Sequence, residues 1–221
     1  MTLPEHPAEL ARLMDSTLLK AMATRQDIEK LCRDARTHQF RSVVVNGSRV
    51  LQAAALLEET EVKIVAVAGF PLGAMDADVK RFEIEVAVDN GAQEIEVVMN
   101  LGWLKEGNDA ATLRELRDVM EAAEERLVGV IIETGLLTDA EKIRAAQLVI
   151  ESGGKSVVIG TGFIGGVPTE DDVRLLRDTL GEKPSAKAAG NLRDARAALA
   201  LLAAGATRVG SSEALRLLRS L

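Results

Sequence analysis

The chain has 221 residues, of which 47% are hydrophobic, and its formal net charge is −7. This length and apolar content predict one domain, residues 1–221, with a sizeable core. An acidic chain without a basic cluster or an aromatic platform gives no sign of nucleic-acid binding. No apolar run approaches the ~20 residues that a membrane span needs. The N-terminal residues show no signal-peptide pattern, so we expect a cytoplasmic protein that binds no membrane.

Cysteine and histidine are scarce. Cys32 is the only cysteine, and His6 and His38 are the only histidines. No cluster of His, Asp or Glu has the spacing of metal ligands, so we expect neither a metal nor another cofactor.

Short apolar runs alternate with amphipathic segments along the chain, which indicates βα units around a parallel sheet. A short N-terminal helix comes first. Strands are expected at Met14–Thr17, Ser42–Val45, Lys63–Ala68, Glu94–Met99, Gly129–Glu133, Ser156–Gly160, Ser185–Ala188 and Thr207–Gly210. Helices are expected at Arg25–His38, Ser48–Glu59, Asp76–Asn90, Ala110–Arg126, Asp139–Ser152, Glu170–Leu180, Leu192–Ala204 and Glu213–Ser220.

Eight such units predict a closed (β/α)8 barrel of the TIM type. An open doubly wound sheet is the alternative, but no Gly-x-Gly-x-x-Gly follows the first strand. In a barrel, the carboxyl ends of the strands build the active site. The candidate site residues at those ends are Asp15, Thr17, Asn46, Glu96, Thr161, Gly162, Lys187, Gly190, Asn191, Gly210, Ser211 and Ser212.

Glu96 and Lys187 are the charged candidates for catalysis. Both lie inside apolar strand segments, where an unpaired charge would be costly. A carboxylate and an amine in one cleft form a pair for proton transfer. The alternative is an ion pair with a structural role only, and the sequence leaves both open.

The turns after the sixth, seventh and eighth strands favour phosphate binding. Each is rich in glycine and presents backbone N–H groups, and Ser211 and Ser212 add hydroxyls at the start of the last helix. Barrels often bind phosphate after strands seven and eight. Turn glycines and a serine helix cap would explain any one of these turns alone.

The chain resembles deoxyribose-phosphate aldolase from about Met14 to Ser212. Asp15-Ser-Thr-Leu-Leu-Lys20 is similar to the family's Asp-His-Thr-Leu-Leu-Lys, and Val43-Val-Val-Asn46 to its Val-Cys-Val-Asn. The other matching segments are Gly69-Phe-Pro-Leu-Gly73, Gly91-Ala-Gln-Glu-Ile-Glu96, Ile131-Ile-Glu-Thr-Gly-Leu-Leu-Thr138 and Lys187-Ala-Ala-Gly190. In this order and spacing they are specific to the family. The resemblance implies a TIM barrel, a lyase that uses a Schiff base, and a role in deoxyribonucleotide catabolism.

The sequence departs from the family at the centre of the site. Within Lys155-Ser-Val-Val158-Ile-Gly160-Thr-Gly162-Phe163, the last eight residues, from Ser156, stand where the family has Phe-Val-Lys-Thr-Ser-Thr-Gly-Phe, so Val158 replaces the lysine that forms the Schiff base. A valine cannot form an imine. Lys155 is three residues away and is expected to face the opposite side of the strand. Lys187 corresponds to the family's second active-site lysine.

Three further departures follow the same alignment. Glu96 replaces the proton-relaying aspartate, and Gly129 stands at a position that is usually lysine. The chain has no tyrosine, so the family's C-terminal catalytic tyrosine has no counterpart.

Three functions stay open on the sequence. The first is cleavage of 2-deoxyribose 5-phosphate to glyceraldehyde 3-phosphate and acetaldehyde, with the imine at Lys187 or with weak residual activity. The second is binding of a sugar phosphate without catalysis. The third is altered chemistry, such as an isomerase with Glu96 as base. The expected partner is a small phosphorylated sugar or aldehyde, and a homodimer is one option for the assembly.

Overall fold

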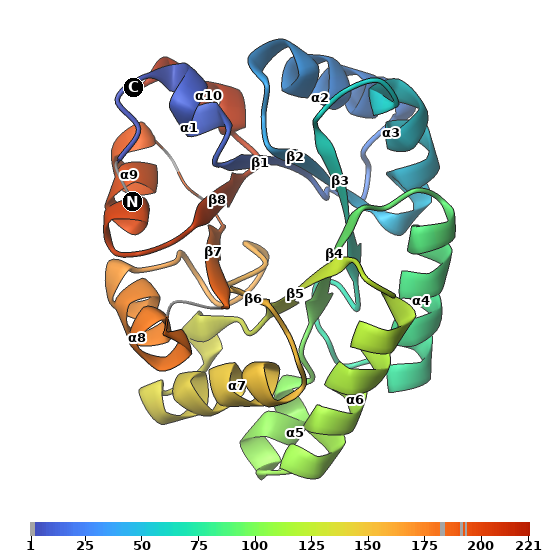
Figure 1. Ribbon diagram of the computed structural model, residues 1–221, viewed down its shortest axis with the longest axis vertical. Coiled ribbons are helices and arrows are strands. Elements are labelled where there is room, and N and C mark those ends of the chain that lie inside the picture. Colours follow the sequence, from blue (N-terminus) through green and yellow to red (C-terminus); the bar gives the residue numbers. More distant parts are fainter. Residues whose placement is uncertain (1–2, 182–183, 191, 193) are drawn as a thin grey trace.

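The structure is a computed structural model that describes residues 3–181, 184–190, 192 and 194–221. Eight parallel strands pair in chain order and close into a barrel inside a ring of helices (Figure 1). The strands are β1 (Met14–Leu18), β2 (Ser42–Asn46), β3 (Lys63–Ala68), β4 (Glu94–Val98), β5 (Leu127–Ile131), β6 (Ser156–Val158), β7 (Ser185–Ala189) and β8 (Arg208–Ser211). The predicted (β/α)8 barrel is therefore confirmed.

The helices follow the strands along the chain, after a short N-terminal helix. They are α1 (Pro7–Ala11), α2 (Arg25–His38), α3 (Val50–Leu57), α4 (Ala77–Asp89), α5 (Leu101–Glu106), α6 (Asp109–Ala122), α7 (Asp139–Glu151), α8 (Glu170–Leu180), α9 (Ala195–Ala203) and α10 (Ala214–Arg219), with short 3-10 turns η1 (Gly47–Arg49) and η2 (Thr134–Leu136). None of the helices in the described ranges combines the length and apolarity that crossing a bilayer demands.

Local sequence signals explain where the helices begin. At the start of α2, the Thr24 hydroxyl accepts a hydrogen bond from the Asp27 N–H at 3.3 Å, and the Asp27 carboxylate accepts one from the Thr24 N–H at 2.8 Å. This reciprocal cap satisfies N–H groups that have no partner within the helix. Asp194 caps α9 by accepting from the Ala197 N–H at 2.9 Å, so this helix begins three residues later than the sequence suggested.

Strand alternation divides the apolar side chains between two regions. Outward-facing residues such as Val157 and Ile159 join the large core between the barrel and its helices. Inward-facing residues pack in the barrel interior, where one cluster contains Val98, Ile131, Val158 and Ala189. The helices thus cover the outside of the barrel, and the inward-facing side chains near the carboxyl ends of the strands are placed to form a site.

Two differences from the expected elements have local causes. β5 ends at Ile131 because Glu133 takes a left-handed backbone conformation, with φ of 50°. The additional helix α5 follows β4 and begins where the Asn100 side chain accepts a hydrogen bond from the Trp103 N–H at 3.3 Å. Figure 1 places α5 at the outer edge of the molecule, beside α6 and α7.

Candidate active site

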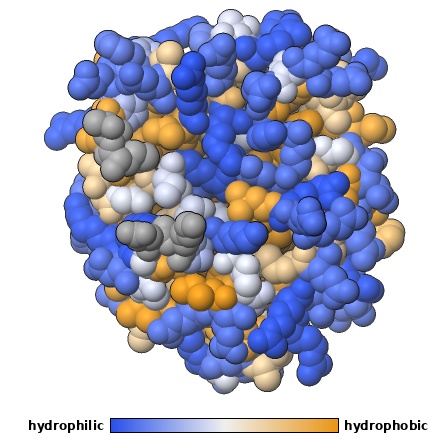
Figure 2. Space-filling model, viewed as in Figure 1, coloured by the Kyte–Doolittle hydropathy of each residue, from blue (hydrophilic) through white to orange (hydrophobic). Residues whose placement is uncertain are grey.

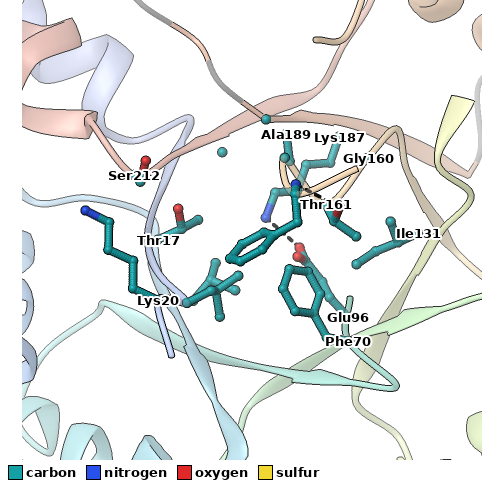
Figure 3. Close-up of a pocket in the computed structure, with 16 residues that line it drawn as sticks. Thr17, Lys20, Phe70, Glu96, Ile131, Gly160, Thr161, Lys187, Ala189 and Ser212 are labelled. Carbon is teal, nitrogen blue, oxygen red and sulfur yellow. Dashed lines mark hydrogen bonds and ion pairs between the residues drawn. The ribbon is translucent and has the colours of Figure 1, made fainter. Parts of the chain in front are cut away.

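A cavity of about 260 Å³ lies at the carboxyl ends of the strands (Figure 3). It is lined by Thr17, Leu19, Lys20, Val44, Phe70, Glu96, Ile131, Gly160, Thr161, Gly162, Phe163, Lys187, Ala189, Gly190, Gly210 and Ser212. Thr17, Lys20 and Ser212 lie on one side of the cavity, and Lys187, Glu96 and Ile131 lie on the other. The surface viewed down the barrel axis is mostly hydrophilic, with apolar patches between the polar residues (Figure 2).

Lys187 on β7 is held between two carboxylates. Its ammonium nitrogen lies 2.5 Å from Glu96 Oε1 on β4 and 2.7 Å from Asp15 Oδ2 on β1. The Lys187 and Asp15 side chains are 0% exposed. The structure thus brings together three residues predicted for the catalytic site, and the lysine and Glu96 also line the cavity.

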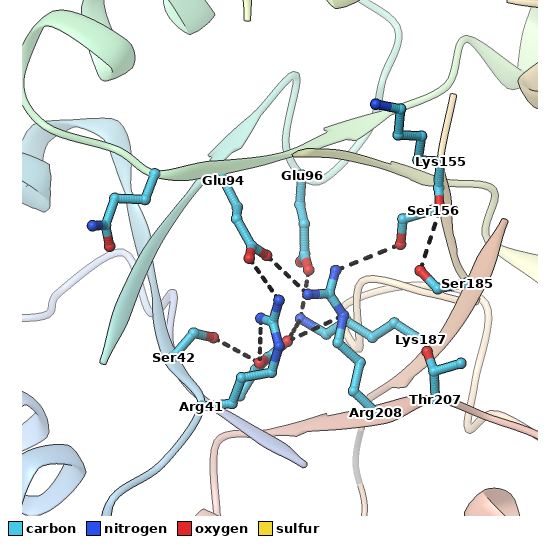
Figure 4. Close-up of polar contacts among 12 residues, drawn as sticks. Arg41, Ser42, Glu94, Glu96, Lys155, Ser156, Ser185, Lys187, Thr207 and Arg208 are labelled. Carbon is cyan, nitrogen blue, oxygen red and sulfur yellow. Dashed lines mark hydrogen bonds and ion pairs between the residues drawn. The ribbon is translucent and has the colours of Figure 1, made fainter. Parts of the chain in front are cut away.

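A second layer of charge lies beneath Lys187 (Figure 4). Arg208 donates to Glu94 at 2.8 Å, and Arg41 contacts Glu94 at 2.6 Å and Asp15 at 3.3 Å. Ser42 donates its hydroxyl to Asp15 Oδ1 at 2.7 Å. Burial alone would raise the pKa of Asp15, but the nearby cations outweigh it and hold that pKa well below the ordinary range.

This interior network balances three cations against three carboxylates. Its charged members are Arg41, Lys187, Arg208, Asp15, Glu94 and Glu96. Buried charges are stable only when they are paired in this way. The sequence reading singled out only half of this group, because Arg41, Glu94 and Arg208 lie at strand beginnings.

Val158 faces the barrel interior, as its alignment with the family's lysine predicted. It belongs to the interior apolar cluster and lies opposite Lys187 in the β6–β7 register. A Cβ atom placed on Gly129 would lie 3.0 Å from Val158 Cγ2 and 3.4 Å from Glu96 Cγ. Val158 is therefore next to the Glu96–Lys187 pair. Lys155 is exposed and remote from the cavity lining.

The proposed phosphate-binding residues divide into two groups. Thr17, Thr161, Gly162, Gly190, Gly210 and Ser212 line the cavity. Ser211 and Asn46 do not line it. The Ser211 hydroxyl accepts a hydrogen bond from the Glu213 N–H at 3.0 Å, and the Asn46 amide donates to the Leu19 carbonyl at 3.3 Å. Asn191 lies outside the described residues.

Several lining residues were not assigned to the site from the sequence. Phe70 and Phe163 meet edge to face, with ring centroids 5.2 Å apart, and Lys20 reaches the cavity from the segment after β1. Each lies after a strand and within a quoted family segment, and that position was the available signal. Trp103 on α5 is outside the lining.

Metal ligation has no geometric support in the described ranges. Among those residues, no three His, Cys, Asp or Glu side chains gather as a bound ion requires. Cys32 is buried, and burial raises the pKa of its thiol to about 11, so it is a poor nucleophile.

Known proteins are similar to this chain over most of its length. A family described as DeoC/LacD family aldolase matches residues 10–207. A deoxyribose-phosphate aldolase from Alkaliphilus oremlandii is 48% identical over 204 residues, which are 92% of each chain. One from Carboxydothermus hydrogenoformans is 44% identical over 217 residues, covering 96% of this chain and 95% of its own.

Solved structures agree. A deoxyribose phosphate aldolase structure from Aeropyrum pernix, described as tetrameric, has a TM-score of 0.90 at 30% identity and covers 97% of this chain and 91% of its own. The closed barrel and these relatives define an aldolase-type TIM barrel. The chain belongs to the DeoC/LacD family of aldolases, and within that family it is similar to the deoxyribose-phosphate aldolases.

Proposed function

We propose that the cavity binds a small phosphorylated sugar of the 2-deoxyribose 5-phosphate type and that the family's imine chemistry is strongly impaired. The observation that carries this proposal is Val158, which puts methyl groups where the family has its amine. The glycine-rich ends of β6, β7 and β8 supply the backbone N–H groups for a phosphate.

Lys187 is a poor replacement for the missing lysine. An amine attacks a carbonyl only when it has lost its proton. Asp15 and Glu96 hold the Lys187 nitrogen in two close ion pairs, at 2.7 and 2.5 Å, which it would have to leave to reach a carbonyl carbon. Cleavage through an imine at Lys187 should therefore be slow.

A second candidate is proton transfer on a bound sugar phosphate. Glu96 and Lys187 line the same cavity and contact each other at 2.5 Å. With Glu96 as base and the Lys187 ammonium near the developing oxyanion, an isomerase-type reaction needs no imine.

One experiment separates these functions. The protein is incubated with deoxyribose 5-phosphate or acetaldehyde, reduced with borohydride, and mapped by peptide mass spectrometry, while ligand binding is measured by calorimetry. We expect binding of deoxyribose 5-phosphate and no reduced adduct. An adduct on Lys187 would instead support the lyase function, with the imine at Lys187. Exchange of substrate C–H protons with deuterated water, without an adduct, would favour the isomerase.

A further inference from the structure

Glu133 lies behind the loop that follows β6 and takes no part in the chemistry proposed above. Its side chain is buried, and the whole residue is only 2% exposed. Its Oε2 accepts hydrogen bonds from the Thr161 N–H at 3.0 Å and from the Thr161 hydroxyl at 2.6 Å. A non-glycine residue with φ of 50° is uncommon, and here that conformation directs the side chain beneath the loop.

The loop is shaped around this carboxylate. A Cβ atom at Gly160 would lie 2.8 Å from Glu133 Oε1, and one at Gly165 would lie 2.6 Å from it. A side chain at either position would therefore force the Glu133 carboxylate to shift. The two glycines therefore let the loop close over Glu133 as well as approach a ligand.

Thr161 connects the carboxylate to the cavity. Its hydroxyl donates to Glu133 and accepts hydrogen bonds from the N–H groups of Phe163 at 3.0 Å and Ile164 at 3.4 Å. Gly160, Thr161 and Phe163 all line the cavity. The position of this part of the cavity wall thus depends on one buried carboxylate.

Glu133 is ionisable, and in the part of the chain that the structure describes its carboxylate is held by Thr161 and not by a cation. Residues 159–166, which enclose it, contain no titratable side chain. On the adjacent helices, Lys142 is paired with Asp172 at 2.7 Å, and Asp172 also accepts from Thr134 at 3.2 Å. Burial raises the pKa of Glu133, and the two hydrogen bonds from Thr161 offset this only in part.

We propose that Glu133 is the positioning residue of an anion-binding loop and takes up a proton from solvent when an anion occupies the cavity. This inference rests on the sugar-phosphate site proposed above. An anion next to residues 160–163 adds a second negative charge to a region that already holds a buried carboxylate. Protonation of Glu133 removes that repulsion, so anion affinity should increase as the pH falls through the pKa of Glu133.

Sulfate is the probe of choice because it stays a dianion throughout the range tested, so any proton taken up belongs to the protein. Calorimetry in buffers of different ionisation enthalpy, at about pH 5.5 and about pH 7.5, measures affinity and proton uptake together. We expect sulfate to bind the wild type several-fold more tightly at the lower pH, with uptake of a fraction of a proton. Each pKa unit of coupling corresponds to about a tenfold change in affinity.

Glu133→Gln keeps the size of the side chain and removes its titration, so the pH dependence and the proton uptake should both fall. Glu151→Gln, the same change at an exposed position of α7, should leave both as in the wild type. Thr161→Val should weaken sulfate binding at both pH values, and Thr161→Ser should restore it by returning the hydroxyl.

The outcomes separate the two proposals. One outcome is that the Glu133→Gln variant binds sulfate and deoxyribose 5-phosphate with the full pH dependence and proton uptake of the wild type. That result overturns the role of Glu133 but leaves the proposal of a sugar-phosphate site intact. Equal binding by the Thr161→Val and Thr161→Ser variants also overturns it. A wild type that binds neither anion overturns both proposals.

Discussion

At the scale of single residues, the proposed loss of imine chemistry rests on position 158. The valine side chain lies in the interior apolar cluster. Among the described residues that line the cavity, the amines are those of the buried Lys187 and the exposed Lys20. The charges around Lys187 are already balanced. Val158 is thus the departure that bears directly on imine formation, beside the departures at Glu96 and Gly129.

Val158→Lys should create an imine-forming site. Gly129 next to it has no side chain, which leaves room for the new lysine. Lys187 would be a like charge nearby, and it would lower the pKa of the new amine and so increase its unprotonated fraction. We expect a borohydride-trappable adduct at position 158 and increased retro-aldol activity on deoxyribose 5-phosphate.

Val158→Met is the matched control, because it is also long and unbranched but has no amine.

Glu96 is one methylene longer than the family's aspartate, and a shift of ~1 Å in a proton relay can cost on the order of 100-fold in rate. Adding Glu96→Asp should therefore increase the activity of the lysine variant. A double variant that folds and binds ligand but forms no adduct would mean that the pocket has been remodelled beyond the aldolase template.

Asp15→Asn should destabilise the protein in a pH-dependent way. Breaking a buried ion pair by removing one partner typically costs about 3–5 kcal/mol. Because the folded-state pKa of Asp15 is lowered, its contribution is present above the ordinary value of about 3.9 and is lost as the pH falls below it. Urea denaturation should show a large difference from wild type at neutral pH that shrinks in acid. The exposed Asp89→Asn should show little difference at either pH.

At the scale of elements, two adjacent serines in the turn from β8 to α10 have different roles. Ser211 is buried and accepts from the Glu213 N–H, whereas Ser212 lines the cavity. Ser212→Glu should therefore reduce phosphate affinity by at least tenfold through charge repulsion, with thermal stability near that of wild type. Ser211→Ala should lower the free energy of unfolding by about 1 kcal/mol through the lost cap-like bond. Unchanged phosphate affinity in Ser212→Glu would place the anion elsewhere.

A buried ion pair outside the barrel positions the end of β4. Lys80 on α4 donates to the Val98 carbonyl at 2.9 Å and contacts Glu115 on α6 at 2.5 Å, while Glu115 accepts from the Asn100 N–H at 3.2 Å. Burial lowers the pKa of Lys80 and raises that of Glu115. The pair thus connects two helices to the strand that carries Glu96.

Replacing one member of this pair should lower the free energy of unfolding more than replacing both. We expect Glu115→Leu to cost about 3–5 kcal/mol because it leaves a buried ammonium without its partner. Adding Lys80→Met should recover much of that loss. A double-mutant cycle in urea measures the coupling, and additive effects of the two substitutions would contradict it.

At the scale of the whole molecule, ligand binding and unfolding should be linked. A closed barrel exists only when all eight strands are paired, so we expect one calorimetric transition for residues 1–221. Deoxyribose 5-phosphate at 100 times its Kd should raise the free energy of unfolding by about 2.7 kcal/mol. Deoxyribose without the phosphate, at the same concentration, serves as the control. Two transitions, of which only one shifts with ligand, would show that the chain does not unfold as one unit.

The sequence by itself determined the strands, most of the helices and the polar strand ends, because these depend on local signals. Apolar runs, helix caps such as Thr24 and turn glycines act over a few residues. Even the inward direction of Val158 followed from strand alternation, once its family alignment was known.

Tertiary structure alone decided which charges meet. Arg208 and Glu94 are 114 residues apart in the chain, and Lys187 and Glu96 are 91 apart, yet each pair is in contact. Charged residues at strand beginnings are typical of surface positions in a sequence. Closure of the barrel places the side chains of Arg41, Glu94 and Arg208 in one shared interior. Glu133 stands at the end of a predicted strand, but its burial depends on a loop that folds back over it, and this position was decided by the tertiary structure. Local patterns specify elements, whereas the pairing of distant charges is set by the geometry of the closed sheet.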